Sequence, residues 1–177
     1  MIRHAAPSAA IAALLSAGMA QANTVEVYLV DPLDNLQNGY CVDISGGQGP
    51  LADPSAGLQG HTCYSPSGNI FVDQGFGPDR FADGIFYMPE FDVCMQAPST
   101  EPGTALELVS CDGSEAQNFI FSGAGTITPA SAPQLCVTVG ADTRFGRSEE
   151  NQIKALTLEP CTDARAAYQI WGNRSAE

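Results

Sequence analysis

The sequence lacks the signatures of several protein classes. The apolar run at residues 9–20 falls short of the roughly 20 residues of a membrane-spanning helix, and no later run approaches that length. There is no Cys-x-x-Cys, Gly-x-Ser-x-Gly or His-Glu-x-x-His motif, and no phosphate-binding or dinucleotide-binding glycine loop. Sustained helical periodicity is also missing after residue 22. These absences argue against a membrane anchor, a zinc ribbon, the common hydrolases and a helical bundle.

Histidine is scarce, and this limits catalysis. His61 is the single histidine after residue 22, so a Ser-His-Asp or Cys-His mechanism would have to use it. Acidic pairs such as Glu90/Asp92 could serve as glycosidase carboxylates, but among 20 acidic residues such pairs arise by chance. We therefore predict that the protein is not an enzyme, and we expect no cofactor and no metal.

Basic residues are few. The chain has 7 Lys and Arg against 20 Asp and Glu, a formal net charge of −13. Such a surface repels nucleic-acid phosphates and anionic lipids over about a Debye length, whereas a neutral ligand such as a sugar is unaffected. The composition therefore predicts neither a nucleic-acid partner nor membrane insertion.

The first 22 residues have the pattern of a signal peptide. Arg3 and His4 provide a basic start, the apolar run follows, and Ala20-Gln21-Ala22 forms a small-x-small cleavage site. We predict a signal peptide at 1–22 and a single domain at 23–177, secreted or periplasmic. The 6 cysteines all follow the cleavage site, and an even number in an exported chain indicates disulfides.

An internal repeat organises the predicted domain. Three segments share a cysteine within a short strand, a variable loop, a second strand ending in cysteine, and then Gln-x-aromatic. The repeats cover about residues 25–80, 81–122 and 123–172. Their shared elements are Cys41, Cys63 and Gln74-Gly75-Phe76; Cys94, Cys111 and Gln117-Asn118-Phe119; and Cys136, Cys161 and Gln169-Ile170-Trp171.

Repeat symmetry selects a disulfide pattern. Six cysteines allow 15 pairings, and spacing alone does not choose among them. Pairing within each repeat is the simplest assignment, and each bridge would stabilise the fold by roughly 3 kcal/mol on the chain-entropy estimate. The predicted pairs are Cys41–Cys63, Cys94–Cys111 and Cys136–Cys161.

Short β-branched and aromatic runs between Gly, Pro, Ser, Asp and Asn clusters predict an all-β fold with about four strands per repeat. The long loop at residues 141–155, with its charged run 144–150, is expected to be a solvated surface excursion. Besides the strands that carry the cysteines of each repeat, the predicted strands are Val25–Val30, Ile70–Val72, Ile85–Tyr87 and Phe119–Phe121.

Cys41-Val42-Asp43, the paired cysteines and Gln169-Ile170-Trp171 resemble the ricin B-type lectin family. The resemblance covers roughly residues 25–172, and it implies a β-trefoil of three pseudo-symmetric repeats. The Gln-x-Trp element is complete only in the third repeat, because Phe76 and Phe119 replace tryptophan in the others. In this family the aromatic residue belongs to the core.

The resemblance also implies where a sugar would bind. In the family, an Asp just after the first cysteine accepts hydrogen bonds from sugar hydroxyls, and an aromatic just before the second cysteine stacks on the sugar. Polar residues near that aromatic and beside the glutamine complete the site. The first repeat matches best, with His61 as a smaller platform than the usual aromatic. The predicted ligand residues are Asp43, Gln59, His61, Asp73 and Gln74.

The other two repeats depart further from the family pattern. The second has Gln96 in place of the Asp and Val109 in place of the ring, whereas the third has Thr138 and Glu159 there, with Tyr168 before the glutamine. We therefore expect a secreted carbohydrate-binding module with one site. The alternative is an accessory β-trefoil subunit with degenerate sugar sites, which docks on a protein such as an exported toxin or enzyme. A trefoil protease inhibitor is a third possibility, but we identify no reactive loop.

Overall fold

The computed structural model describes residues 24–65 and 72–175, so the predicted signal peptide lies outside the described residues. The described chain is built of short strands and 3-10 helices. The strands are β1 (Glu26–Leu29), β2 (Tyr40–Ile44), β3 (Leu58–Thr62), β4 (Tyr87–Met88), β5 (Val93–Gln96), β6 (Glu107–Ser110), β7 (Phe119–Ile120), β8 (Ala124–Gly125), β9 (Thr128–Pro129), β10 (Leu135–Val139), β11 (Arg144–Phe145), β12 (Gln152–Lys154), β13 (Leu156–Pro160) and β14 (Trp171–Arg174). The 3-10 helices are η1 (Pro54–Ala56), η2 (Val72–Gln74), η3 (Pro78–Asp83), η4 (Glu115–Gln117) and η5 (Asp163–Tyr168).

The all-β prediction is confirmed, although some predicted strand bounds were wrong. Ile85 precedes β4 and Phe121 follows β7, so both lie outside strands. Of the predicted strand Ile70–Val72, residues 70 and 71 lie outside the described residues. Val72 instead begins η2, where its carbonyl accepts a hydrogen bond from the Gly75 N–H at 3.2 Å and closes a turn.

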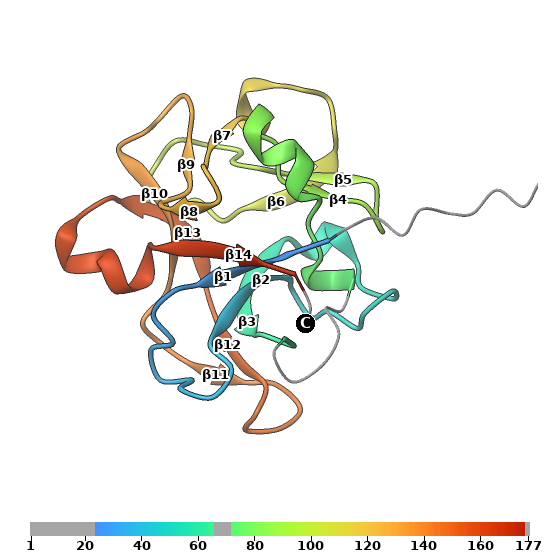
Figure 1. The fold of residues 1–177 in the computed structure, drawn as a ribbon, viewed down its shortest axis with the longest axis vertical. Helices are drawn as coiled ribbons and strands as arrows, with labels where there is room; N and C mark the ends of the chain where they lie inside the picture. Colours follow the sequence, from blue (N-terminus) through green and yellow to red (C-terminus); the bar gives the residue numbers. More distant parts are fainter. Residues whose placement is uncertain (1–23, 66–71, 176–177) are drawn as a thin grey trace, which may run out of the picture.

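The strands pair within and between repeats (Figure 1). Each repeat has a central pair of antiparallel strands, which we call its central hairpin: β2–β3, β5–β6 and β10–β13. The first strand of each pair carries the first cysteine of the repeat, and the second strand ends directly before the second cysteine. The largest sheet has the order β11-β12-β3-β2-β1-β14-β8. In this sheet β1 pairs along its whole length with β14, so the first and last strands of the described chain are neighbours.

The three disulfides are those predicted from repeat symmetry. Their Cα–Cα distances are 5.0 Å for Cys41–Cys63, 5.0 Å for Cys94–Cys111 and 5.2 Å for Cys136–Cys161. Each bridge joins the two strands of one central hairpin at the end that leads into the Gln-x-aromatic element. Each sequence repeat therefore contains one disulfide at an equivalent position.

The repeated aromatic residues lie in one hydrophobic core, as predicted. Phe76, Phe119 and Trp171 are all buried in it. Phe86 makes edge-to-face contacts with both phenylalanines, at centroid distances of 6.1 and 5.8 Å. The Trp171 indole also donates to the Val137 carbonyl at 2.9 Å. One core therefore joins the three repeats.

The glutamine of each Gln-x-aromatic element holds the backbone around the second cysteine of its repeat. In the third repeat, Gln169 Nε2 donates to the Pro160 carbonyl at 3.0 Å and Oε1 accepts from the Thr162 N–H at 3.3 Å. Equivalent bonds flank the second cysteine in the other repeats. They join Gln74 to Thr62 and Tyr64, and Gln117 to Ser110 and Asp112.

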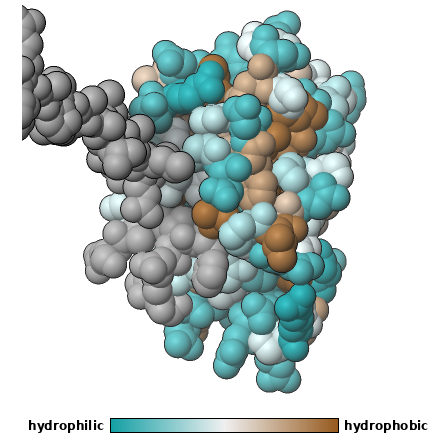
Figure 2. Space-filling view, turned by 90° about the vertical axis from the view of Figure 1, so that its right-hand side faces the viewer, coloured by the Kyte–Doolittle hydropathy of each residue, from teal (hydrophilic) through white to brown (hydrophobic). Residues whose placement is uncertain are grey.

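Hydrophilic side chains cover much of one face of the molecule (Figure 2). Figure 2 shows one face on which a band of hydrophobic side chains crosses mostly hydrophilic surroundings. Within residues 24–65 and 72–175, no helix has the length and hydrophobicity needed to cross a bilayer.

Candidate functional site

The predicted ligand residues of the first repeat lie on and behind the hairpin β2–β3. Asp43 is directly opposite Gln59 in the strand register. His61 lies two residues further along β3, so its side chain is on the same side of the hairpin as that of Gln59. On β2, the core residues Val42 and Ile44 alternate with Asp43, which turns the carboxyl away from the core.

The carboxyl group of Asp43 is enclosed, with 1% of the residue exposed. Its Oδ1 accepts from Gln59 Nε2 at 3.0 Å, and its Oδ2 accepts from Gln74 Nε2 at 2.8 Å. Burial raises the pKa of Asp43 to about 8, although both amide hydrogen bonds act to lower it. The group is therefore mostly protonated at pH 7 and can donate as well as accept.

His61 and Tyr64 supply the aromatic surface beside Asp43. Their ring centroids lie 5.6 Å apart with a tilt of 50°. The His61 Nδ1 is 3.0 Å from the Thr62 carbonyl, which can only accept, so this nitrogen carries the proton and Nε2 is the acceptor. Burial lowers the pKa of His61 and keeps the ring neutral.

Asp73 shapes the glycine-rich loop at residues 46–49. Its Oδ2 accepts from the Gly49 N–H at 2.8 Å, and its Oδ1 is the one buried side-chain polar atom without a partner in the described chain. A Cβ on Gly47 would lie 2.5 Å from the same Oδ2, so glycine is required for this close approach. Asp73 thus positions the loop from behind.

The hairpin β11–β12 of the third repeat lies against the first repeat (Figure 1). Strand β12 pairs with β3, with Ile153 opposite His61. Arg144 on β11 donates from Nη2 to Gln59 Oε1 at 3.0 Å. The charged run 144–150 is exposed as expected, but the view of residues 141–155 as only a solvated excursion was wrong. Backbone pairing with β3 makes this segment part of the first repeat's surroundings.

Lys154 fixes this hairpin in place. Its side chain is 2% exposed, and Nζ forms an ion pair with Asp34 Oδ1 at 3.1 Å. Nζ also donates to Thr143 Oγ1 at 2.7 Å and to the Ala141 carbonyl at 2.9 Å, and it lies 5.1 Å from the Tyr40 ring centroid. The hairpin is therefore tied to the first repeat by a buried cation.

A hollow of about 540 Å³ opens where these elements meet, and we call it the first-repeat hollow. Its floor is formed by β2 and β3, one wall by the glycine-rich loop, and the opposite wall by the hairpin β11–β12. Its lining residues are Asp43, Gly46, Gly47, Gln48, Gly49, Pro50, Leu51, Gln59, His61, Tyr64, Gly146, Arg147, Asn151 and Ile153.

The structure thus places the five predicted ligand residues in two positions. Asp43, Gln59 and His61 line the hollow. Asp73 and Gln74 lie behind it, fully buried, where they hold the loop and the Asp43 carboxyl. Sequence reasoning missed Tyr64 and the residues from β11–β12. The aromatic directly after Cys63 was a usable signal for Tyr64, because the strand end places its ring beside that of His61.

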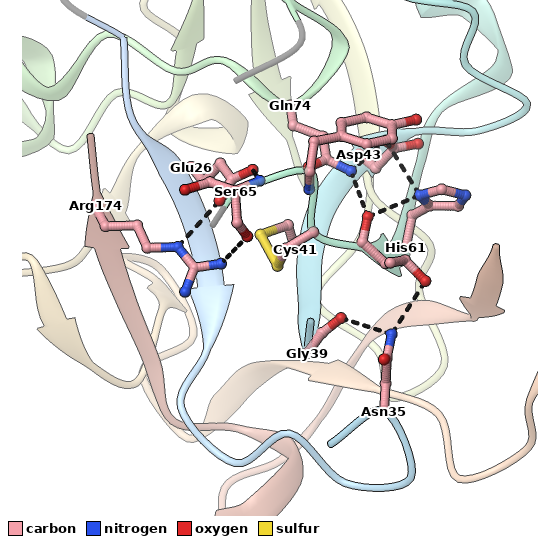
Figure 3. The surroundings of a disulfide bond; sticks show 12 residues. Glu26, Asn35, Gly39, Cys41, Asp43, His61, Ser65, Gln74 and Arg174 are labelled. Atoms are coloured by element: carbon pink, nitrogen blue, oxygen red, sulfur yellow. Dashed lines mark hydrogen bonds and ion pairs between the residues drawn. A yellow bond between two sulfur atoms is a disulfide. The ribbon is translucent and has the colours of Figure 1, made fainter. Parts of the chain in front are cut away.

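The surroundings of the first disulfide offer no metal site among the described residues. Glu26 lies near the sulfurs of Cys41 and Cys63, but those sulfurs are bonded to each other. Glu26 instead accepts from the Ser65 N–H at 2.8 Å and from Arg174 Nε at 3.1 Å. Figure 3 shows this group on one side of the disulfide, with His61 and Asp43 on the other.

The equivalent positions of the other repeats differ in shape and charge. In the third, Thr138, Glu159 and Tyr168 line a smaller hollow of about 300 Å³, and Arg165 pairs with Glu159 at 2.8 Å. In the second, Gln96 Nε2 donates to Glu107 Oε2 at 3.0 Å on the exposed surface. The first-repeat hollow is therefore larger than the hollow at the equivalent position of the third repeat.

A family model decides the assignment. The ricin-type beta-trefoil lectin domain matches residues 85–176, which is the second and third repeats and half of the chain. The chain belongs to the ricin-type β-trefoil lectin family. Comparison with curated protein sequences gave no significant match.

Solved structures show the same β-trefoil fold. The designed threefold-symmetric protein ThreeFoil has a TM-score of 0.58 and 12% identity, covering 85% of this chain and 97% of its own. The earthworm R-type lectin C-half, solved with GalNAc, has 0.53 and 16%, covering 86% and 98%. The Vibrio vulnificus hemolysin/cytolysin β-trefoil lectin, solved with N-acetyl-D-lactosamine, has 0.53 and 16%, covering 88% and 96%. At these identities the likeness concerns the fold.

Proposed function

We propose that this ricin-type β-trefoil is an exported, non-catalytic carbohydrate-binding module whose ligand occupies the first-repeat hollow. One observation carries the proposal: Asp43, Gln59 and His61 meet on the floor of one open hollow, with the Tyr64 ring beside them. The mixture of hydrogen-bonding groups and aromatic surface suits a sugar, which has both hydroxyls and an apolar face. The lectins solved with GalNAc and N-acetyl-D-lactosamine support this class of ligand.

In this proposal the five residues act in two ways. Gln59 and His61 meet sugar hydroxyls at the surface of the hollow, with Asp43 below them. Gln74 fixes the Asp43 carboxyl, and Asp73 fixes the glycine-rich loop. Export is supported by the predicted signal peptide and by the three disulfides, which form in oxidising compartments.

A glycan array with matched variants tests the proposal. The mature protein should give a reproducible signal that His61→Ala reduces at least about tenfold, because the ring supplies both an acceptor and a stacking surface. Tyr168→Ala alters the third-repeat hollow and serves as the control, with the signal retained. Asp43→Ala should also abolish the signal, with circular dichroism checking that the fold persists.

The array also separates the rival function. An absence of signal from the wild-type protein on a broad array would overturn the lectin proposal and favour an accessory subunit that docks on a protein partner. A signal lost in Tyr168→Ala and kept in His61→Ala would move the site to the third repeat.

A further inference from the structure

The basic side chains of the described residues differ in whether an acid neutralises them. Three form ion pairs with carboxylates, and the other three form none. The chain has 20 acidic residues, so a bound anion is attracted most strongly to an arginine that has no acidic partner. The paired residues are Lys154, Arg165 and Arg174, and the unpaired ones are Arg80, Arg144 and Arg147.

Two of the three unpaired arginines lie on the hairpin β11–β12 and its turn, and one of them lines the first-repeat hollow. Arg147 lines the hollow directly, and its side chain is exposed. Arg144 does not line it, but its Nη2 donates to Gln59, which lines both this hollow and a neighbouring one that Arg144 lines. Arg80 lies elsewhere, on η3, with its guanidinium 5.0 Å from the Tyr87 ring centroid.

In the described chain, no acid near the hollow forms an ion pair with Arg147. Among the described lining residues Asp43 is the one carboxyl, and burial raises its pKa to about 8, so it is mostly uncharged at pH 7. Asp73 is enclosed behind the glycine-rich loop. Glu149 and Glu150 are exposed on the same hairpin turn, but they neither line the hollow nor pair with Arg147. Among the described lining residues, Arg147 is therefore a cation that no carboxylate pairs with.

We propose that the first-repeat hollow selects an acidic glycan, with Arg147 as the residue that meets the anionic group of the sugar. The inference rests on the proposed function of this hollow as a sugar site. A guanidinium matches a carboxylate or sulfate with two parallel hydrogen bonds, which supplies both energy and orientation. The neutral ring of the sugar then lies over Gln59, His61 and Tyr64, and Arg144 adds long-range attraction without leaving Gln59.

Titration calorimetry with three related sugars tests this selection. The probes are lactose, 6'-sialyllactose and sulfated lactose, which are neutral, carboxylated and sulfated. The wild-type protein should bind an acidic probe at least about tenfold more tightly than lactose, since hydrogen bonds to charged groups are the stronger ones. The preference for carboxylate or sulfate identifies which anion the wall fits. Raising the salt concentration should weaken only the acidic probes.

A pair of charge-matched variants assigns the effect. Arg147→Gln should lower the affinity for the acidic probe to the level of the affinity for lactose. Arg80→Gln removes the same charge away from the hollow and should change neither. If the wild type bound lactose as tightly as the acidic probes, the inference would be overturned, whereas the proposed lectin function would stand. An unchanged preference in Arg147→Gln would also overturn it, whereas no binding to any glycan would overturn the function itself.

Discussion

The carboxyl group of Asp43 is almost wholly enclosed, with amide donors from Gln59 and Gln74 on its two oxygens. The ordinary role of such a residue in this family is an ionised acceptor for sugar hydroxyls. Here burial favours the protonated form, so the residue changes from a pure acceptor to a group with one O–H donor. The same residue type at this motif position can thus be an ionised acceptor or a protonated donor, depending on how deeply the carboxyl group is buried.

This protonation makes stability depend on pH. The pKa of Asp43 is about 8 in the folded protein against an ordinary 3.8, so the folded state binds the extra proton. The resulting stabilisation is fully present below pH 3.8 and is lost as pH rises through 8. Asp43→Asn, which imitates the neutral acid, should remove this loss, which amounts to at most about 1.4 kcal/mol per pH unit.

Urea unfolding at pH 5, 6.5 and 8 measures the effect, with the wild type and Asp43→Asn compared at each pH. The difference between the two proteins cancels the other titrating groups. If the free energies of unfolding of the two proteins changed with pH in the same way, Asp43 would be ionised in the folded protein.

At the scale of elements, the hairpin β11–β12 is the piece that leaves its own repeat. It pairs with β3 of the first repeat and supplies one wall of the first-repeat hollow. The buried Nζ of Lys154 holds it there through Asp34, Thr143 and the Ala141 carbonyl. The site of one repeat is therefore completed by another.

Replacement of Lys154 tests this dependence. Lys154→Met keeps the aliphatic stem against Tyr40 and removes the charged hydrogen bonds, which should cost about 1–3 kcal/mol and loosen the hairpin. Sugar affinity should fall although Lys154 does not line the hollow. Urea unfolding measures the first effect and hydrogen exchange over residues 141–154 the second.

Arg165→Met is the matched control for this variant. It breaks the exposed Arg165–Glu159 pair, which contributes less than about 1 kcal/mol, and leaves β11–β12 in place. Equal effects from the two variants would mean that Lys154 has no special role in the hairpin.

The sequence predicted some of these elements and not others for identifiable reasons. Cysteine spacing and the Gln-x-aromatic elements repeat three times, so the central hairpins and the disulfides could be predicted. The pairing of β12 with β3 could not, because residues 141–155 occur in one repeat only and carry no periodic signal. The burial of Asp73 and Gln74 could not be predicted either, because a motif specifies residue types and not how far each side chain is buried.

At the scale of the whole molecule, three disulfides and one shared core support a chain that is rich in loops. The bridges span 22, 17 and 25 residues, so each is expected to contribute about 3 kcal/mol by restricting the unfolded chain. Cohesion between repeats comes from the core, where Phe86 joins Phe76 to Phe119. Each disulfide thus stabilises a single repeat, whereas packing in the shared core holds the three repeats together.

Removal of the second-repeat bridge separates these contributions. The double variant Cys94→Ser and Cys111→Ser should lose about 3 kcal/mol in urea unfolding, and its first-repeat hollow should still bind sugar. This bridge lies away from the hollow, so it is preferable to Cys41–Cys63 for the purpose. If the variant kept its full stability but lost sugar binding, the bridge would not act as a stabiliser of its own repeat alone.

The pairing of β1 with β14 has a consequence for proteolysis. Strand β14 supports β1, β1 pairs with the Cys41 end of β2, and β2 carries Asp43. Arg174 also neutralises the buried Glu26 carboxylate, which a cut before residue 171 would leave as an isolated charge. Removal of the chain from Trp171 onward would thus inactivate the hollow, even though no described residue beyond Ile153 lines it.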